Sequence, residues 1–152
     1  MYKHILLPTD GSELSEASIR AGIELARDQQ AKVTGLYVMP DYRSVVYGAD
    51  VLVPGNSDAF DESVKKNADK ALGFIEAMAK QANVPYDSVR LTSNFPYQAI
   101  VKQAHESGCD LICMASHGRK GLSGVLLGSE TQKVLAHTNI PVLVHRPAVS
   151  KT

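Results

Sequence analysis

The chain has 152 residues, 44% of them hydrophobic, and this length predicts a single domain with one core. Lysine and arginine total 16, as do aspartate and glutamate, so the net charge is zero with histidine neutral, which argues against a nucleic-acid binder. No apolar run is long enough to cross a membrane and the first residues do not form a signal peptide, so we expect a cytoplasmic protein that binds neither membrane nor nucleic acid.

Short apolar strands alternate with amphipathic helices along the chain. The predicted strands cover residues 3–8, 32–38, 88–92, 110–115 and 142–145. The predicted helices cover about 13–27, 64–82, 96–107 and 129–137, the third beginning at Pro96 and ending at Gly108. This order predicts a doubly wound α/β fold, a mostly parallel sheet covered on both faces, over residues 1–147 with a tail at 148–152.

Two features leave alternatives open. Cys109 and Cys113 are four residues apart in an apolar stretch, a separation of about 13 Å along a strand that excludes a disulfide, so we expect buried thiols ahead of a metal or redox role. Residues 40–57 form a connection longer than the usual limit of about 12–15 residues. It is either a surface loop that covers a sheet edge or a lid or partner surface.

A glycine-rich segment joins the fourth strand to the fourth helix, with Gly118, Gly121, Gly124 and Gly128 within eleven residues. Glycines let backbone amides approach a ligand, and a helix start offers unpaired N–H groups, so the segment can cradle phosphate. It matches neither GxGxxG nor Walker A. Ser129 followed by Gln132 also predicts a capping box, and the two interpretations are compatible.

Ligands of open parallel sheets bind beyond the carboxyl ends of the strands, where the strand order reverses. Here those ends are Pro8-Thr9-Asp10, Val38 and Ala115-Ser116-His117. At these residues the sequence resembles the universal stress protein family. The matching segments are Pro8–Ser12, Tyr37–Val38, Met114–Gly118, Gly128–Thr131 and Pro141–Val144. The glycine pattern of the family's nucleotide-binding branch is reproduced in spacing, with Ala115 at the first glycine.

The resemblance implies a Rossmann-like sheet in the order 3-2-1-4-5, of the adenine nucleotide alpha hydrolase type, homodimers, and binding of ATP, ADP or AMP with or without Mg²⁺. By position it assigns Asp10 to the ribose or adenine side, the Val38 backbone to the adenine edge, and Pro8 and Thr9 to the base pocket. It assigns Met114, Ala115, His117 and Gly118 to the ribose and α-phosphate, and Gly128, Ser129 and Thr131 to the outer phosphates. Ser116, Arg119, Gly121 and Glu130 complete the predicted set of cofactor-binding residues.

Some of these residues have simpler interpretations. Asp10 can cap its own turn, and His117 can pack on its loop. Ala115 adds a methyl group where the family has glycine, which is tolerable only if φ is not positive. The Glu130 carboxylate would disfavour a bare triphosphate unless Mg²⁺ intervenes or the side chain turns to solvent.

The leading hypothesis is an adenine-nucleotide-binding regulatory module of the stress response. The alternatives are a nucleotide-free dimeric interaction protein of the same fold and a slow ATP hydrolase; we assign no catalytic residue, because no base-plus-metal set is visible. The fifth strand, Val142–His145, is predicted to be a sheet edge and the homodimer interface, unless loop 40–57 or the tail covers it. The sequence does not identify a protein partner.

Overall fold

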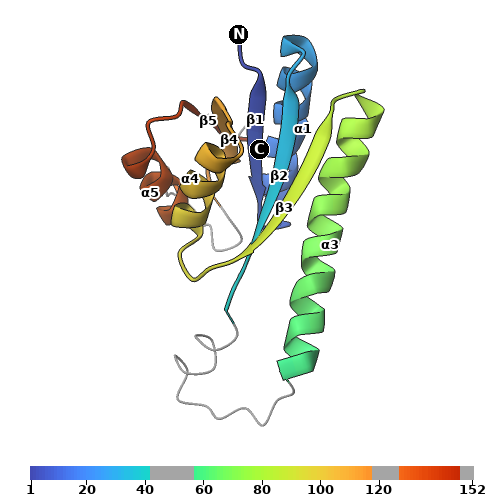
Figure 1. Cartoon of the computed structure of the whole chain (residues 1–152), viewed down its shortest axis with the longest axis vertical. Coiled ribbons are helices and arrows are strands. Elements are labelled where there is room, and N and C mark those ends of the chain that lie inside the picture. Colours follow the sequence, from blue (N-terminus) through green and yellow to red (C-terminus); the bar gives the residue numbers. More distant parts are fainter. Residues whose placement is uncertain (42–56, 118–126, 148–152) are drawn as a thin grey trace, which may run out of the picture.

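The computed structural model describes residues 1–41, 57–117 and 127–147, which form a five-stranded sheet flanked by helices (Figure 1). The strands are β1 (His4–Thr9), β2 (Lys32–Met39), β3 (Tyr86–Thr92), β4 (Leu111–Ala115) and β5 (Val142–His145). The helices are α1 (Glu13–Gln29), α3 (Ser57–Gln81), α4 (Pro96–Glu106) and α5 (Ser129–His137).

The sheet has the order β3-β2-β1-β4-β5 with every pair parallel, so the predicted fold class and strand order are confirmed. Most boundaries differ from the prediction by a residue or two. The largest difference is α3, which begins at Ser57 rather than near Val64, because its first turns carry exposed polar residues such as Asp61 and Glu62 that give no apolar period. Gly108 follows α4 with φ +70°, the predicted left-handed conformation.

The two faces of the sheet bury alternate residues of its central strands. Ile5 and Leu7 of β1 pack under α1 and α3, whereas Leu6 packs under α4 and α5, which lie on the opposite side in Figure 1. Helix α1 approaches the sheet closely at Gly22, where a Cβ atom would lie 2.6 Å from Leu7 Cδ2. The small residues on the inner face of α1 therefore fix the spacing between helix and sheet.

Both cysteines are free and buried, as the sequence predicts. Burial raises the pKa of the Cys109 thiol and of the Cys113 thiol to about 11 each. Thiolates are scarce at neutral pH under these conditions, so the pair has the character of core side chains rather than reactive groups.

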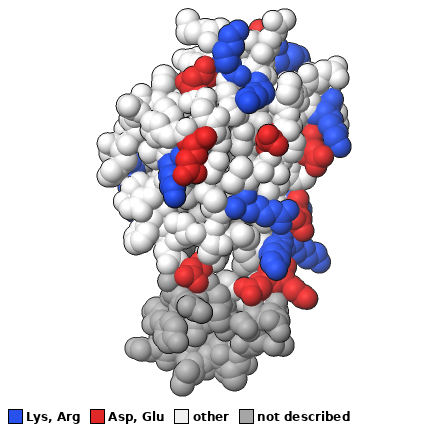
Figure 2. Space-filling model, in the orientation of Figure 1, with Lys and Arg blue, Asp and Glu red and all other residues white. Residues whose placement is uncertain are grey.

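The described surface carries mixed charge. Figure 2 shows acidic and basic side chains intermingled on one face, in keeping with the zero net charge of the chain. Within the described ranges, no helix is long and apolar enough to cross a membrane.

The start of β1 carries a buried histidine. His4 is 7% exposed, and its Nε2 atom lies 2.7 Å from Thr34 Oγ1 of β2. Burial, and after it the charge of Lys32, lowers the pKa of His4. Two causes act in opposite directions on the pKa of the neighbouring Asp110 carboxyl. Burial raises this pKa, but hydrogen bonds from the His4 and Lys3 amides outweigh burial and leave it lowered.

The lowered pKa of His4 predicts a loss of stability on mild acidification. The unfolded chain binds this proton more readily than the folded one, so the free energy of unfolding falls as pH drops below about 6.5. His4→Gln, which stays neutral, should flatten the fall between about pH 7 and pH 5 in urea denaturation. Asp110 acts in a separate window, because its contribution is lost only below about pH 4. His105→Gln, at an exposed position of α4, is the control, and equal slopes for wild type and His4→Gln would contradict the assignment.

Candidate functional site

A cleft opens where β1 and β4 part at their carboxyl ends. The two strands are paired at Ile5–Leu111 and Leu6–Ile112, and the pairing stops there although both strands continue. The Lys3 carbonyl accepts from the Lys32 N–H of β2, and the His4 carbonyl accepts from the Asp110 N–H ahead of β4. Because backbone groups alternate in direction along a strand, the backbone of Pro8 faces β4, as that of His4 does. Proline has no N–H to offer that neighbour, which removes one donor from the ladder beyond Leu6.

The cleft has a volume of about 1020 Å³ and collects most of the predicted site residues. Those that line it are Pro8, Thr9, Asp10, Val38, Met114, Ala115, His117, Gly128, Ser129, Glu130 and Thr131. Ser116 lies beneath the surface at 1% exposure, and Gly118, Arg119 and Gly121 lie outside the described residues, as does most of loop 40–57. The strand ends named from sequence thus converge on one concave surface.

The sequence did not point to one wall of this cleft. Pro96 and Ile100 of α4, with Lys133, Ala136 and His137 of α5, extend it between these two helices. The sequence gives no indication that these residues are neighbours, because α4 and α5 are brought together only by their common packing on one face of the sheet. The helical period predicted their buried sides but not their neighbours.

The backbone of Val38 is aimed at the cleft. At the start of β2, the Lys32 N–H donates toward β1 and the Val33 N–H donates toward β3. Continued alternation turns the Val38 backbone toward β1, whose last pairing with β2 joins Thr9 to Tyr37. Val38 therefore presents backbone groups just beyond the end of β1.

Asp10 holds the turn that follows β1. Its Oδ1 atom accepts from the Ser12 N–H at 2.9 Å and from Ser15 Oγ at 2.7 Å, while Thr9 Oγ1 accepts from the Gly11 N–H at 3.0 Å. Gly11 has φ +79°, which few other residues adopt without strain. The turn-capping interpretation of Asp10 is thus correct, and the same carboxylate also borders the cleft.

The residues after β4 fasten the entrance of α5 to the sheet. The Ser116 N–H donates to the His145 carbonyl of β5 at 3.0 Å, and the Ser116 carbonyl accepts from the Gly128 N–H at 2.6 Å. Ser116 Oγ lies 3.0 Å from His117 Nδ1. Ser116 is therefore a positioning residue, and the Gly128 N–H is already in use.

Ala115 does not have the positive φ that would make its methyl group unfavourable. It is an extended strand residue and is not among the positive-φ positions, so its methyl group causes no backbone strain. Its carbonyl accepts from the hydroxyl of Thr131 at 3.0 Å, and Thr131 is 3% exposed. The Thr131 hydroxyl proton thus ties α5 to β4, which leaves the Thr131 N–H as the group of this residue that can serve a phosphate.

The predicted capping box at the start of α5 is wrong. The N-cap residue is Gly128, which has no side chain to cap with, and Gln132 Nε2 donates outward to the Leu127 carbonyl at 2.9 Å. The first bond of the helix runs from the Gln132 N–H to the Gly128 carbonyl. The N–H groups of Ser129, Glu130 and Thr131 precede it and have no acceptor within the helix. These are the donors that a phosphate at this helix start would use.

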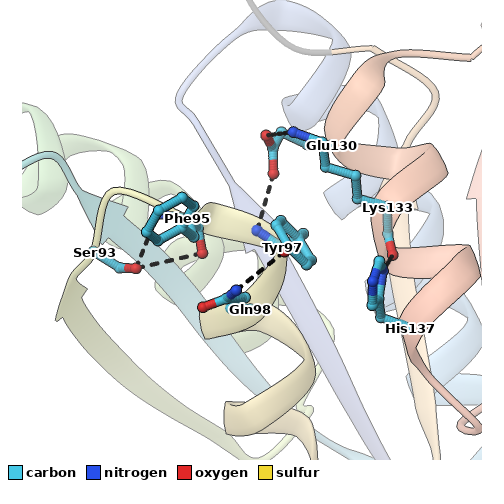
Figure 3. Close-up of polar contacts among 7 residues, drawn as sticks. All are labelled: Ser93, Phe95, Tyr97, Gln98, Glu130, Lys133 and His137. Atoms are coloured by element: carbon cyan, nitrogen blue, oxygen red, sulfur yellow. Dashed lines mark hydrogen bonds and ion pairs between the residues drawn. The ribbon is translucent and has the colours of Figure 1, made fainter.

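The Glu130 side chain is 39% exposed, yet its carboxylate is held by contacts to both helices. Its Oε2 atom accepts from the Tyr97 N–H at 2.9 Å, and its Oε1 atom lies 3.6 Å from Lys133 Nζ (Figure 3). Lys133 Nζ also lies 5.5 Å from the centre of the Tyr97 ring, and that ring lies 5.0 Å from the ring of His137. Figure 3 shows these side chains bridging the first turn of α4 and the facing side of α5.

Comparison with known proteins decides the family. The sequence model described as Universal stress protein family matches residues 1–146. The chain belongs to the universal stress protein family.

Individual members of the family match along nearly the whole chain. Universal stress protein MJ0531 of Methanocaldococcus jannaschii is 32% identical over 144 residues, which are 95% of this chain and 82% of that protein. The solved structure of MJ0577 from the same organism superimposes with a TM-score of 0.76 at 29% identity and covers 99% of both chains. A universal stress protein of Archaeoglobus fulgidus, solved in complex with dAMP, shares the fold with a TM-score of 0.63 at 20% identity, over 94% of this chain and 97% of that one.

Thr131 provides a test of how α5 is held in this universal stress protein. Thr131→Val keeps the side-chain shape but leaves the buried Ala115 carbonyl without its donor, so the free energy of unfolding should fall by about 1–3 kcal/mol in urea denaturation. Thr92→Val, at the exposed end of β3, should change it by less than about 0.5 kcal/mol. A Thr131→Val protein as stable as wild type would show that the bond does not hold the helix.

Proposed function

We propose that the cleft binds an adenine nucleotide and that the protein acts as a nucleotide-responsive regulatory module. The supporting observation is that the Val38 backbone, the turn at Asp10 and the three first-turn N–H groups of α5 all border one cleft. A base needs fixed donors and acceptors at its edge, a ribose needs a hydrogen-bond acceptor, and a phosphate needs N–H donors at a helix start. The cleft supplies all three kinds of group.

Adenine is favoured over guanine by the rigidity of these groups. Val38 sits in a strand whose backbone direction is set by pairing with β3 on its other side. Its backbone groups cannot exchange donor for acceptor, so guanine, whose edge has the reverse pattern, would leave buried polar groups unpaired. The complex of the Archaeoglobus fulgidus relative with dAMP supports the same class of ligand.

The described residues do not fit a protein-held Mg²⁺ site. Within the described ranges, no group of three or more His, Cys, Asp or Glu side chains could hold a metal ion. The cleft carboxylates, Asp10 and Glu130, are already hydrogen-bonded to neighbouring amides or hydroxyls. We assign no catalytic step and propose ligand-dependent regulation.

Substitution at the start of α5 tests the proposed site. Gly128 has φ −67° and ψ 157°, which valine adopts readily, so Gly128→Val should fold, while its branched side chain obstructs the first-turn donors. Calorimetric titration should show micromolar or tighter binding of AMP or ATP to wild type, loss of at least about tenfold in Gly128→Val, and weaker binding of GTP. Gly73→Val is the matched control, because a Cβ atom at Gly73 meets nothing within 4 Å. If Gly128→Val bound AMP and ATP as tightly as wild type does, this site would be excluded.

The fifth strand is the proposed homodimer interface. The carbonyls of Pro141 and His145 accept from β4 and its continuation, so by alternation the backbones of Val142 and Val144 face away from the sheet. Leu143 is 39% exposed on the same strand. An outward-facing ladder beside an exposed apolar side chain can be satisfied by a second copy across a two-fold axis.

The outward direction of Val144 gives a specific test of the dimer. Val144→Pro removes a donor of the outer edge while the bonds to β4 remain, so the variant should stay folded and shift toward monomer in sedimentation analysis. Val144→Ala keeps the N–H and should remain dimeric. A proline variant as dimeric as wild type would place the interface elsewhere.

A further inference from the structure

The N-termini of two helices meet at the cleft. Pro96, the first residue of α4, and Ser129, the first residue of α5, both line it. In neither helix does the N-cap residue, Phe95 or Gly128, make a side-chain capping bond. Each helix start carries partial positive charge and N–H groups without helical acceptors, so each can hold one anion.

One of these two positions is already filled by the protein. The Glu130 carboxylate accepts from the N–H of Tyr97, the second residue of α4, at 2.9 Å (Figure 3). No such carboxylate bond is found at the start of α5 among the described residues. The chain thus supplies the anion for the start of α4 itself.

Glu130 also places a negative charge beside the start of α5. The Glu130 N–H is one of the three donors at the start of α5. The Glu130 carboxylate therefore lies within one side-chain length of a phosphate bound to that N–H. Lys133 offsets this charge only in part, because their charged atoms are 3.6 Å apart and both side chains are partly exposed, 50% for Lys133 and 39% for Glu130. Among the described residues of the cleft wall, acidic side chains outnumber basic ones, Asp10 and Glu130 against Lys133.

We propose that Glu130 is a specificity residue that limits how many phosphates the ligand carries, favouring an adenosine monophosphate over a triphosphate free of Mg²⁺. This inference rests on the proposed nucleotide function. One phosphate is matched by the first-turn N–H groups of α5, whereas further phosphates add charge near a carboxylate that is held in place by α4. Selectivity arises from repulsion of the longer phosphate tail as well as from attraction of the first phosphate.

The test compares AMP with Mg²⁺-free ATP on matched variants of the full chain. Glu130→Gln removes the charge but keeps an oxygen that can accept from Tyr97, so ATP affinity should rise about tenfold and AMP affinity by no more than about threefold at low ionic strength. High salt should shrink the difference. The control is Glu106→Gln, because Glu106 pairs with Lys102 at the other end of α4. This substitution should change neither affinity.

A second variant separates charge from helix capping. Glu130→Ala removes both the charge and the bond to Tyr97, so it should lower the melting temperature by about 2–4 °C while raising the ratio of ATP to AMP affinity as Glu130→Gln does. If both nucleotides bind and their affinity ratio is the same in wild type, Glu130→Gln and Glu130→Ala, the inference is overturned and the proposed function stands. If no adenine nucleotide binds wild type or either variant, the proposed function fails and the inference fails with it.

Discussion

The separation of β1 from β4 after Leu6 and Ile112 is the constraint on which the rest of the site depends. Pro8 follows two residues later with its backbone toward β4 and no N–H to continue the ladder. The same separation exposes the end of β1, and because β1 ends at Thr9 the backbone of Val38 on β2 opens into the same cleft. A proline in a central strand, normally a defect in a sheet, here marks the opening of the cleft.

Parting two central strands leaves backbone groups that need partners, and side chains from α5 provide one of them. The carbonyl of Ala115 receives the hydroxyl of Thr131, and the carbonyl of Ser116 receives the N–H of Gly128. The separation of the strands leaves the Ala115 carbonyl to fasten α5 to β4, and the Ser116 carbonyl, on the β5 side, adds a second attachment. The first-turn donors of α5 are held in place before any ligand arrives, which reduces the ordering cost of binding.

Ser116 connects two features that the proposed function brings together. Its carbonyl bonds to Gly128 at the start of α5, and its N–H bonds to His145 at the end of β5. The cleft and the outer strand thus share a buried residue, and Glu130 extends the same framework to α4 through Tyr97. A ligand at α5 would contact a framework that spans both helices on this face and the sheet edge.

The sequence by itself determined the order of the elements, the fold class and the strand ends at which the cleft forms. These depend on apolar periodicity, on turn residues such as Gly11 and Gly108, and on a resemblance carried by short segments, all of which are local along the chain. It also located α5 and β5 at their observed bounds. Local patterns sufficed because burial of one face imposes the same period wherever a helix or strand forms.

Only the tertiary structure decided where the side chains of the site direct their hydrogen bonds. Gln132 reaches the Leu127 carbonyl instead of completing the predicted capping box, because Gly128 at the N-cap has no side chain to meet it. Thr131 turns its hydroxyl to a carbonyl 16 positions away, and Glu130 finds an amide 33 positions away. Such partners are distant in sequence and adjacent in space, so no local pattern encodes them, and they follow from the packing of α4 and α5 against one face of the sheet.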